Sequence, residues 1–171
     1  MGDVPDPQDV VAFRRFRDES FYRLLLRSLA SEREVVLGRL RSLGYSDSLE
    51  VQDLSFIANC EADGRSITQL AKQIGVTRQA ASQRVTILER QGLLERTPDS
   101  RDSRVVLVRR TEAANQLLAD SIDVVTGLED RHREVMGEAF GELKRLLAEH
   151  LDHVDPEGLL AATDLERRFG T

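Results

Sequence analysis

Residues 66–108 form the stretch SITQLAKQIGVTRQAASQRVTILERQGLLERTPDSRDSRVVLV, whose caps and glycines decide the fold. Ser66 and Gln69 have the spacing of a capping box, in which each side chain satisfies a free backbone N–H at a helix start. We expect a short helix from about Ile67 to Ile74. Gly75 should end this helix, because glycine adopts the left-handed conformation at low cost.

A second helix is expected directly after that turn, with Thr77 as its cap and Gly92 as its end. Its apolar residues follow the spacing of a buried stripe: Ala81, Val85 and Leu88. At about 100° per residue, the opposite face and its flanks carry Arg78, Gln79, Ser82, Gln83, Thr86 and Arg90. Arg can bridge guanine and Gln can bridge adenine, so this face suits the major groove of DNA. A single helix of this kind would more often be an ordinary solvated face, but this helix does not stand alone.

A β-hairpin is predicted after the second helix. Residues 93–96 and 104–109 have strand composition, and the polar residues 97–103 between them suit a turn. Two short helices followed by a hairpin indicate a winged helix-turn-helix. The fold class that we predict is mainly α with a small β-hairpin wing.

Long helices are expected on both sides of this region. Amphipathic spacing runs from Val10 to about Leu43, and Ser31 either restarts that helix or lies within it. Another helix should cover about Leu49 to Glu61, with Val51, Leu54, Ile57 and Ala58 directed inward. From Thr111 onward the chain should be helical again, and its apolar stripe continues to Leu151.

The apolar stripes at the two ends need a partner, which predicts a homodimer. We expect three regions: 1–47 as N-terminal dimerisation helix or helices, 48–110 as the DNA-binding lobe, and 111–171 as C-terminal dimerisation helices and tail. The residues that we expect at the dimer interface are Phe13, Phe16, Leu143, Leu147 and Leu151.

The charge distribution supports a localised phosphate-binding face. The whole chain carries a net charge of −6, but residues 64–110 contain ten basic and four acidic residues, a net +6. The rest of the chain therefore carries −12. A compact basic segment in an acidic chain is typical of a protein that contacts nucleic acid on one face only.

Residues 66–108 resemble the helix-turn-helix and wing of the MarR family, and Asp99-Ser100-Arg101-Asp102-Ser103-Arg104 is similar to the family's D-x-R-D-x-R signature. The resemblance implies that Arg101 reaches the minor groove, whose negative potential attracts a guanidinium, while Asp102 and Arg104 support the wing. It also implies a dimeric repressor on a pseudo-palindromic operator, released by a small molecule. The DNA-binding candidates are Ser66, Thr77, Arg78, Gln79, Ser82, Gln83, Arg84, Thr86, Arg101 and Arg104.

Other functions have little support in the sequence. There is no nucleotide-binding, hydrolase or metalloprotease motif, so we expect no enzymatic activity, no catalytic residue and no cofactor. His150 and His153 beside Glu149 or Asp152 could hold zinc, but a solvated helix end explains them better, and we predict no metal site. Cys60 is interpreted as a buried, inert thiol in the second helical region rather than a redox sensor.

The remaining expectations concern the cellular location of the protein and an alternative function. A single cysteine, no export signal and no long apolar run predict a cytoplasmic protein that does not span a membrane. The alternative function is a winged-helix protein–protein interaction module without operator binding. Such a module would not need Arg78, Gln83 and Arg101 to face outward together.

Overall fold

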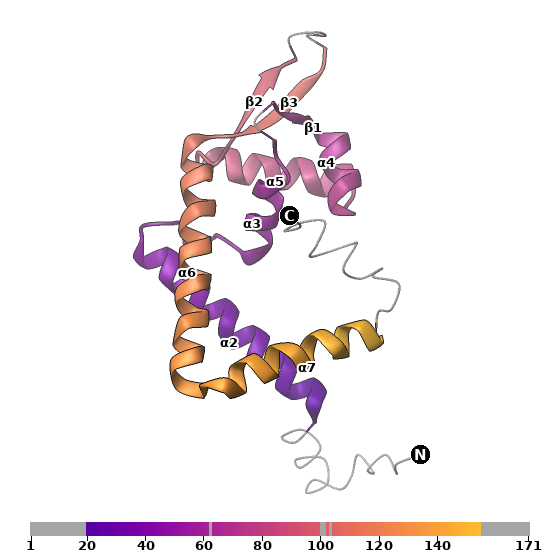
Figure 1. Cartoon of the computed structure of the whole chain (residues 1–171). Coiled ribbons are helices and arrows are strands. Elements are labelled where there is room, and N and C mark those ends of the chain that lie inside the picture. Colours follow the sequence, from indigo (N-terminus) through magenta and orange to yellow (C-terminus); the bar gives the residue numbers. More distant parts are fainter. Residues whose placement is uncertain (1–19, 62, 100–101, 103, 155–171) are drawn as a thin grey trace, which may run out of the picture.

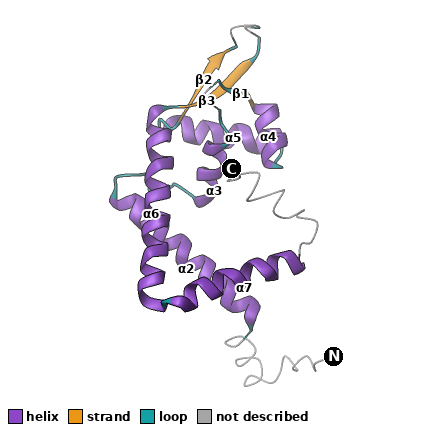
Figure 2. Ribbon diagram, viewed as in Figure 1, coloured by secondary structure: helices purple, strands orange, loops and turns teal. Residues whose placement is uncertain are grey.

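The chain is mostly helical, with one small antiparallel sheet, as the sequence predicts. The computed structural model describes residues 20–61, 63–99, 102 and 104–154. Figures 1 and 2 show the elements in chain order. These are α2 (Phe21–Ser42), α3 (Val51–Ala58), β1 (Arg65–Ser66), α4 (Ile67–Ile74), α5 (Arg78–Arg90), β2 (Leu94–Pro98), β3 (Val106–Arg110), α6 (Glu112–Met136) and α7 (Glu138–Val154).

The helix-turn-helix forms with the predicted caps. Ser66 accepts a hydrogen bond from the Gln69 backbone N–H at 3.3 Å, and the Gln69 side chain accepts one from the Ser66 backbone N–H at 3.0 Å. Gly75 ends α4 with a φ of 76°, which is the left-handed conformation. The two helices α4 and α5 therefore have the bounds and the turn that the capping pattern requires.

The sheet contains one strand that was not predicted. Its order is β1-β3-β2, and β1 consists of only two residues, Arg65 and Ser66, paired with Val108 and Leu107. A two-residue strand shows no periodicity, so the sequence pattern could not reveal it. The hairpin strands also differ from the predicted ranges, because β2 extends to Pro98, which pairs with Val106.

A hydrophobic core joins the helix-turn-helix and the hairpin to the long helices. Its largest fully buried side chains come from five different helices and from strand β2: Leu40, Ile57, Leu70, Leu88, Leu117 and Leu94. In α3, the predicted inward residues Leu54 and Ile57 are buried, whereas Val51 and Ala58 are half-buried. The helix-turn-helix therefore shares one core with α2, α3 and α6, and this core fixes its orientation.

The long flanking helices differ from the predicted ones in where they are continuous and where they break. Helix α2 continues through Ser31 without a restart. Gly137, with a φ of 59°, ends α6, and α7 then leaves at a sharp angle and crosses α2 (Figure 1). The spacing of apolar residues did not predict this break. No described residue of α7 is buried.

Within the described residues, no helix combines the length and the apolar character that crossing a membrane requires.

Candidate nucleic-acid interface

The outer face of α5 displays polar side chains near the start of the helix. Arg78, Gln79 and Gln83 are exposed, while Ala81 and Val85 on the opposite face are completely buried. The helix is therefore fixed by its inner stripe and free on its outer side. A shallow hollow of about 390 Å³ lies on this side, lined by Ser82, Gln83, Thr86, Ile87 and Arg90.

Two of the predicted contact residues serve as helix caps. The Ser66 hydroxyl accepts from the Gln69 N–H, and the Thr77 hydroxyl accepts from the Ala80 N–H at 3.1 Å. Thr77 is exposed and Ser66 is half-buried. Both hydroxyls lie at helix N-termini, where backbone N–H groups also point outward.

Arg84 differs from the other predicted contact residues because its side chain points inward. The guanidinium forms two hydrogen bonds and an ion pair with Asp53, a carboxylate on α3 that is 1% exposed. A charge that satisfies a buried partner is not available to a base or phosphate. The location of Arg84 supports a role in holding α5 rather than in touching DNA.

Thr86 also differs from the predicted outward orientation. It is half-buried, and its hydroxyl donates to the Ser82 carbonyl at 3.0 Å and accepts from Arg96 at 3.0 Å. The spacing of about 100° per residue placed Thr86 outward, because it considers the helix alone. In the structure, β2 packs against this flank of α5. The hydroxyl is engaged with protein groups on both sides.

The loop at the tip of the wing is held by local hydrogen bonds. The Asp102 carboxylate accepts from the Arg104 backbone N–H at 3.0 Å, and the Asp102 carbonyl accepts from the Val105 N–H at 2.9 Å. Asp102 and Arg104 are both exposed. These bonds agree with the supporting role expected for Asp102. Arg101 lies outside the described residues.

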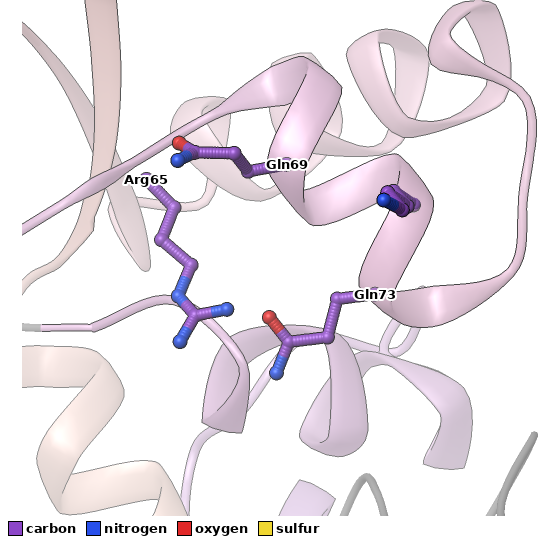
Figure 3. A pocket seen from close by; sticks show the side chains of 4 residues that line it. Arg65, Gln69 and Gln73 are labelled. Carbon is purple, nitrogen blue, oxygen red and sulfur yellow. The ribbon is translucent and has the colours of Figure 1, made fainter.

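A second basic hollow, which the sequence pattern did not predict, lies beside α4. Arg65, Gln69 and Gln73 lie around it in Figure 3, and Lys72 completes the lining. The Arg65 guanidinium pairs with Glu61, and this hydrogen bond holds the pKa of Glu61 below its ordinary value. Arg65 and Lys72 both belong to the basic segment, so the charge count is the sequence signal that could have found them.

The dimerisation candidates that the structure describes lie on α7. Leu143 and Leu151 are 41% and 62% exposed, and Leu147 is half-buried. Phe13 and Phe16 lie outside the described residues. Helix α2 adds further apolar side chains that are exposed in the single chain: Phe21, Tyr22, Leu24, Leu26 and Leu29.

Two histidines of the described residues, His132 and His150, contact protein groups. His132 Nε2 lies 3.1 Å from Glu32 Oε1, and the His150 ring packs edge-on against Phe21 with ring centroids 4.8 Å apart. Among the positions that the structure describes, no three His, Cys, Asp or Glu side chains gather as a metal-binding group.

Comparison with known structures shows a likeness over most of the chain. The transcriptional repressor CouR bound to a 23-mer DNA duplex is 25% identical, with a TM-score of 0.57, covering 78% of this chain and 94% of CouR. CouR from Rhodococcus jostii RHA1 bound to p-coumaroyl-CoA gives 23% identity, a TM-score of 0.55, and coverage of 80% and 92%. The S. aureus MepR–DNA complex gives 17% identity, a TM-score of 0.56, and coverage of 78% and 98%.

Comparison with curated protein sequences returns no match. The sequence model described as the MarR family matches residues 47–105, which span α3, the helix-turn-helix and most of the hairpin. The match covers most of the winged helix and ends before β3. Over residues 47–105 the chain is therefore similar to the MarR family, and its fold resembles that of the transcriptional repressor CouR.

Proposed function

We propose that this protein is a sequence-specific DNA-binding transcription regulator in which α5 is the recognition helix. The observation that carries the proposal is the exposed face of α5, where Arg78, Gln79 and Gln83 stand opposite a fully buried stripe. Arg and Gln are the side chains that make bidentate contacts to guanine and adenine in the major groove. The hairpin beside α5 supplies the wing, and Arg101 is proposed to enter the minor groove.

The proposed DNA-binding unit is a homodimer on a pseudo-palindromic operator. Exposed apolar side chains on α2 and α7 are a surface that a second copy would cover. In a dimer the two recognition helices enter half-sites about one helical turn or a multiple of it apart. The proposed regions are 1–47 and 111–171 for dimerisation and 48–110 for DNA binding.

Repression and release by a small molecule are proposed from the family. CouR is a transcriptional repressor whose structures contain either DNA or p-coumaroyl-CoA. In this chain a hollow of about 220 Å³ lies between α2 and α6, lined by Val35, Arg39, Asp123, Val124, Gly127, Leu128 and Arg131. We propose no enzymatic activity, and we place the protein in the cytoplasm, where its operator would be.

The proposal is tested by a mobility-shift titration on the DNA upstream of the protein's own coding region. We expect a discrete complex at low salt, with affinity falling steeply between about 50 and 200 mM salt as phosphate counterions are released. A Gln83→Ala variant should bind the same fragment more weakly and unrelated DNA equally well.

The alternative, an interaction module without operator binding, predicts a different result. Such a protein would give no shift with its own upstream DNA at low salt, although its basic segment could still hold DNA loosely without preference. Equal binding of all duplexes by the wild-type protein would favour that alternative.

A further inference from the structure

Arg96 on β2 connects the hairpin to the recognition helix through two side chains of α5. Its guanidinium forms an ion pair with Glu89 and donates a hydrogen bond to the Thr86 hydroxyl at 3.0 Å. A longer contact of 3.5 Å reaches the Ser82 carbonyl. The three α5 residues are spaced four and three apart, so they share one flank of the helix.

The strand end of this connection is fixed by the core. Arg96 stands opposite Val108 of β3, which is completely buried, and shares a strand face with Leu94, which is 2% exposed. The Arg96 and Glu89 side chains are themselves only 27% and 35% exposed. The guanidinium therefore has little freedom, and its planar fork holds two acceptors in a fixed direction.

The helix end of the connection lies beside the base-reading face. Ser82 and Thr86 flank Gln83, and the Thr86 hydroxyl also donates to the Ser82 carbonyl. Arg96 therefore contacts the same two turns of α5 that present Gln83 outward. A change in this contact would change the angle between the hairpin and the recognition helix.

We propose that Arg96, acting with Glu89 and Thr86, is a positioning residue that sets the distance between the major-groove and wing contacts on the operator. This inference rests on the proposed function. The residue would not touch DNA itself. It would make the protein selective for operators in which the two groove contacts have one spacing.

The test compares two charge-neutral substitutions on the full-length protein. Glu89→Gln breaks the ion pair between α5 and Arg96. Glu95→Gln is the control, because it removes an exposed carboxylate at the position next to Arg96 on β2. Both remove one negative charge from the DNA-binding lobe, so both should strengthen binding to duplex DNA to a similar extent. Only Glu89→Gln should alter the spacing preference.

The readout is a binding selection on operators in which base pairs are inserted or deleted between the centre and the edge of each half-site. The wild type and Glu95→Gln should prefer one spacing. Arg96→Lys and Glu89→Gln should reduce that preference by about fivefold, the size of a typical coupling between contacting residues. In Arg96→Gln, which removes the charge, the slope of affinity against salt should stay unchanged if Arg96 contacts no phosphate.

A charge-swapped variant keeps the test decisive if a single substitution unfolds the protein. Arg96→Glu combined with Glu89→Arg restores the ion pair and should recover the spacing preference. A phosphate contact by Arg96 would instead give a lower salt slope and no recovery in the swapped variant, which would overturn the inference. If the wild type selects no DNA sequence at all, the proposed function is wrong. If the wild type selects a sequence and every variant keeps the wild-type spacing preference, only the role of Arg96 is wrong.

Discussion

Arg84 on α5, the proposed recognition helix, forms an ion pair with Asp53, whose carboxylate is buried near the start of α3. The same carboxylate accepts a hydrogen bond at 2.8 Å from the Glu50 backbone N–H, so it also caps α3. Two helices are thus tied together at one buried charge. Because removing one member of such a pair leaves the other charge uncompensated, the pair is sensitive to single substitutions.

We predict that Arg84→Met lowers the free energy of unfolding by about 2 to 3 kcal/mol, below the upper range for buried pairs because Arg84 is partly exposed. The double variant Arg84→Met with Asp53→Asn should lose less, since no charge is then left buried. Chemical denaturation measures both. Arg90→Ala, an exposed position on the same helix, is the control, and an equal loss in all three proteins would exclude a special role for the pair.

Tyr45 connects the segment after α2 to α6 through a hydrogen bond of 2.5 Å from its hydroxyl to the Asp120 carboxylate. Burial first, and then the bond and charge of Asp120, raise the pKa of Tyr45 from 10.0 to about 12. Because the folded-state pKa is raised, the stabilisation is complete below pH 10 and is lost as the pH rises toward 12.

The Tyr45→Phe variant provides the measurement of this contact. The wild type should be more stable than Tyr45→Phe at about pH 9, and the difference should shrink by about pH 11, as linkage requires. Tyr22→Phe is the matched control, because Tyr22 is 67% exposed. A stability difference that does not change over this pH range would contradict the role assigned to the Tyr45 hydroxyl.

Cys60 is completely buried, and its thiol contacts the Phe56 carbonyl at 3.4 Å. Burial raises the pKa of the thiol to about 12, although the charges of Arg110 and Arg65 act in the opposite direction. Since the thiolate is the reactive form, we predict no reaction of the folded protein with a thiol reagent at neutral pH and rapid reaction after denaturation. Fast labelling of the folded protein would restore the case for a redox sensor.

The local signals in the sequence predicted the fold well where one residue decides one feature. The Ser66 and Thr77 caps and the turn at Gly75 gave the bounds of α4 and the start of α5. The break at Gly137 was missed because the apolar spacing continues across it, and β1 was missed because two residues carry no pattern. For the candidate interface, the helical spacing correctly predicted that Gln79 and Gln83 are exposed. The same spacing says nothing about the helices and strands that pack against α5.

Arg84 and Thr86 are the residues for which these neighbouring elements change the interpretation. Their partners, Asp53 and Arg96, lie 31 and 10 positions away in the sequence. Only the packing of α3 and β2 against α5 brings these groups together. A propensity or a periodicity describes one segment at a time, so neither could show that the two side chains are occupied.

The exposed apolar side chains of α7 predict a dimer that one charged residue should disrupt. Leu143 and Leu146 are 41% and 49% exposed in the single chain. Leu143→Glu should convert the protein from a dimer to a monomer or an unfolded chain at micromolar concentration, because a carboxylate would be buried at the interface. Sedimentation measures this. Glu142→Gln, on the adjacent exposed position, should remain dimeric, and a stable wild-type monomer would refute the dimer.

The last prediction separates the work of the recognition helix from that of the wing. Gln83 is proposed to face the major groove, where each base pair is distinguishable, so Gln83→Ala should cost about 1 to 3 kcal/mol mainly at one base pair and relax the preference there. Arg101 is proposed to enter the minor groove, where base edges are nearly degenerate. Arg101→Ala should therefore weaken binding to many sequences by similar factors.

The measurement is a binding selection on a randomised palindrome at fixed salt, with the wild type and both variants. The matched control is Glu95→Gln, which leaves both groove contacts in place and should keep the wild-type motif. The assigned roles are reversed if Arg101→Ala rewrites the motif while Gln83→Ala leaves every position unchanged. If neither substitution alters binding, the protein contacts DNA through neither α5 nor the wing. Because a lost minor-groove contact lowers affinity for many sequences to a similar extent and a lost major-groove base contact does not, the selection distinguishes the two patterns.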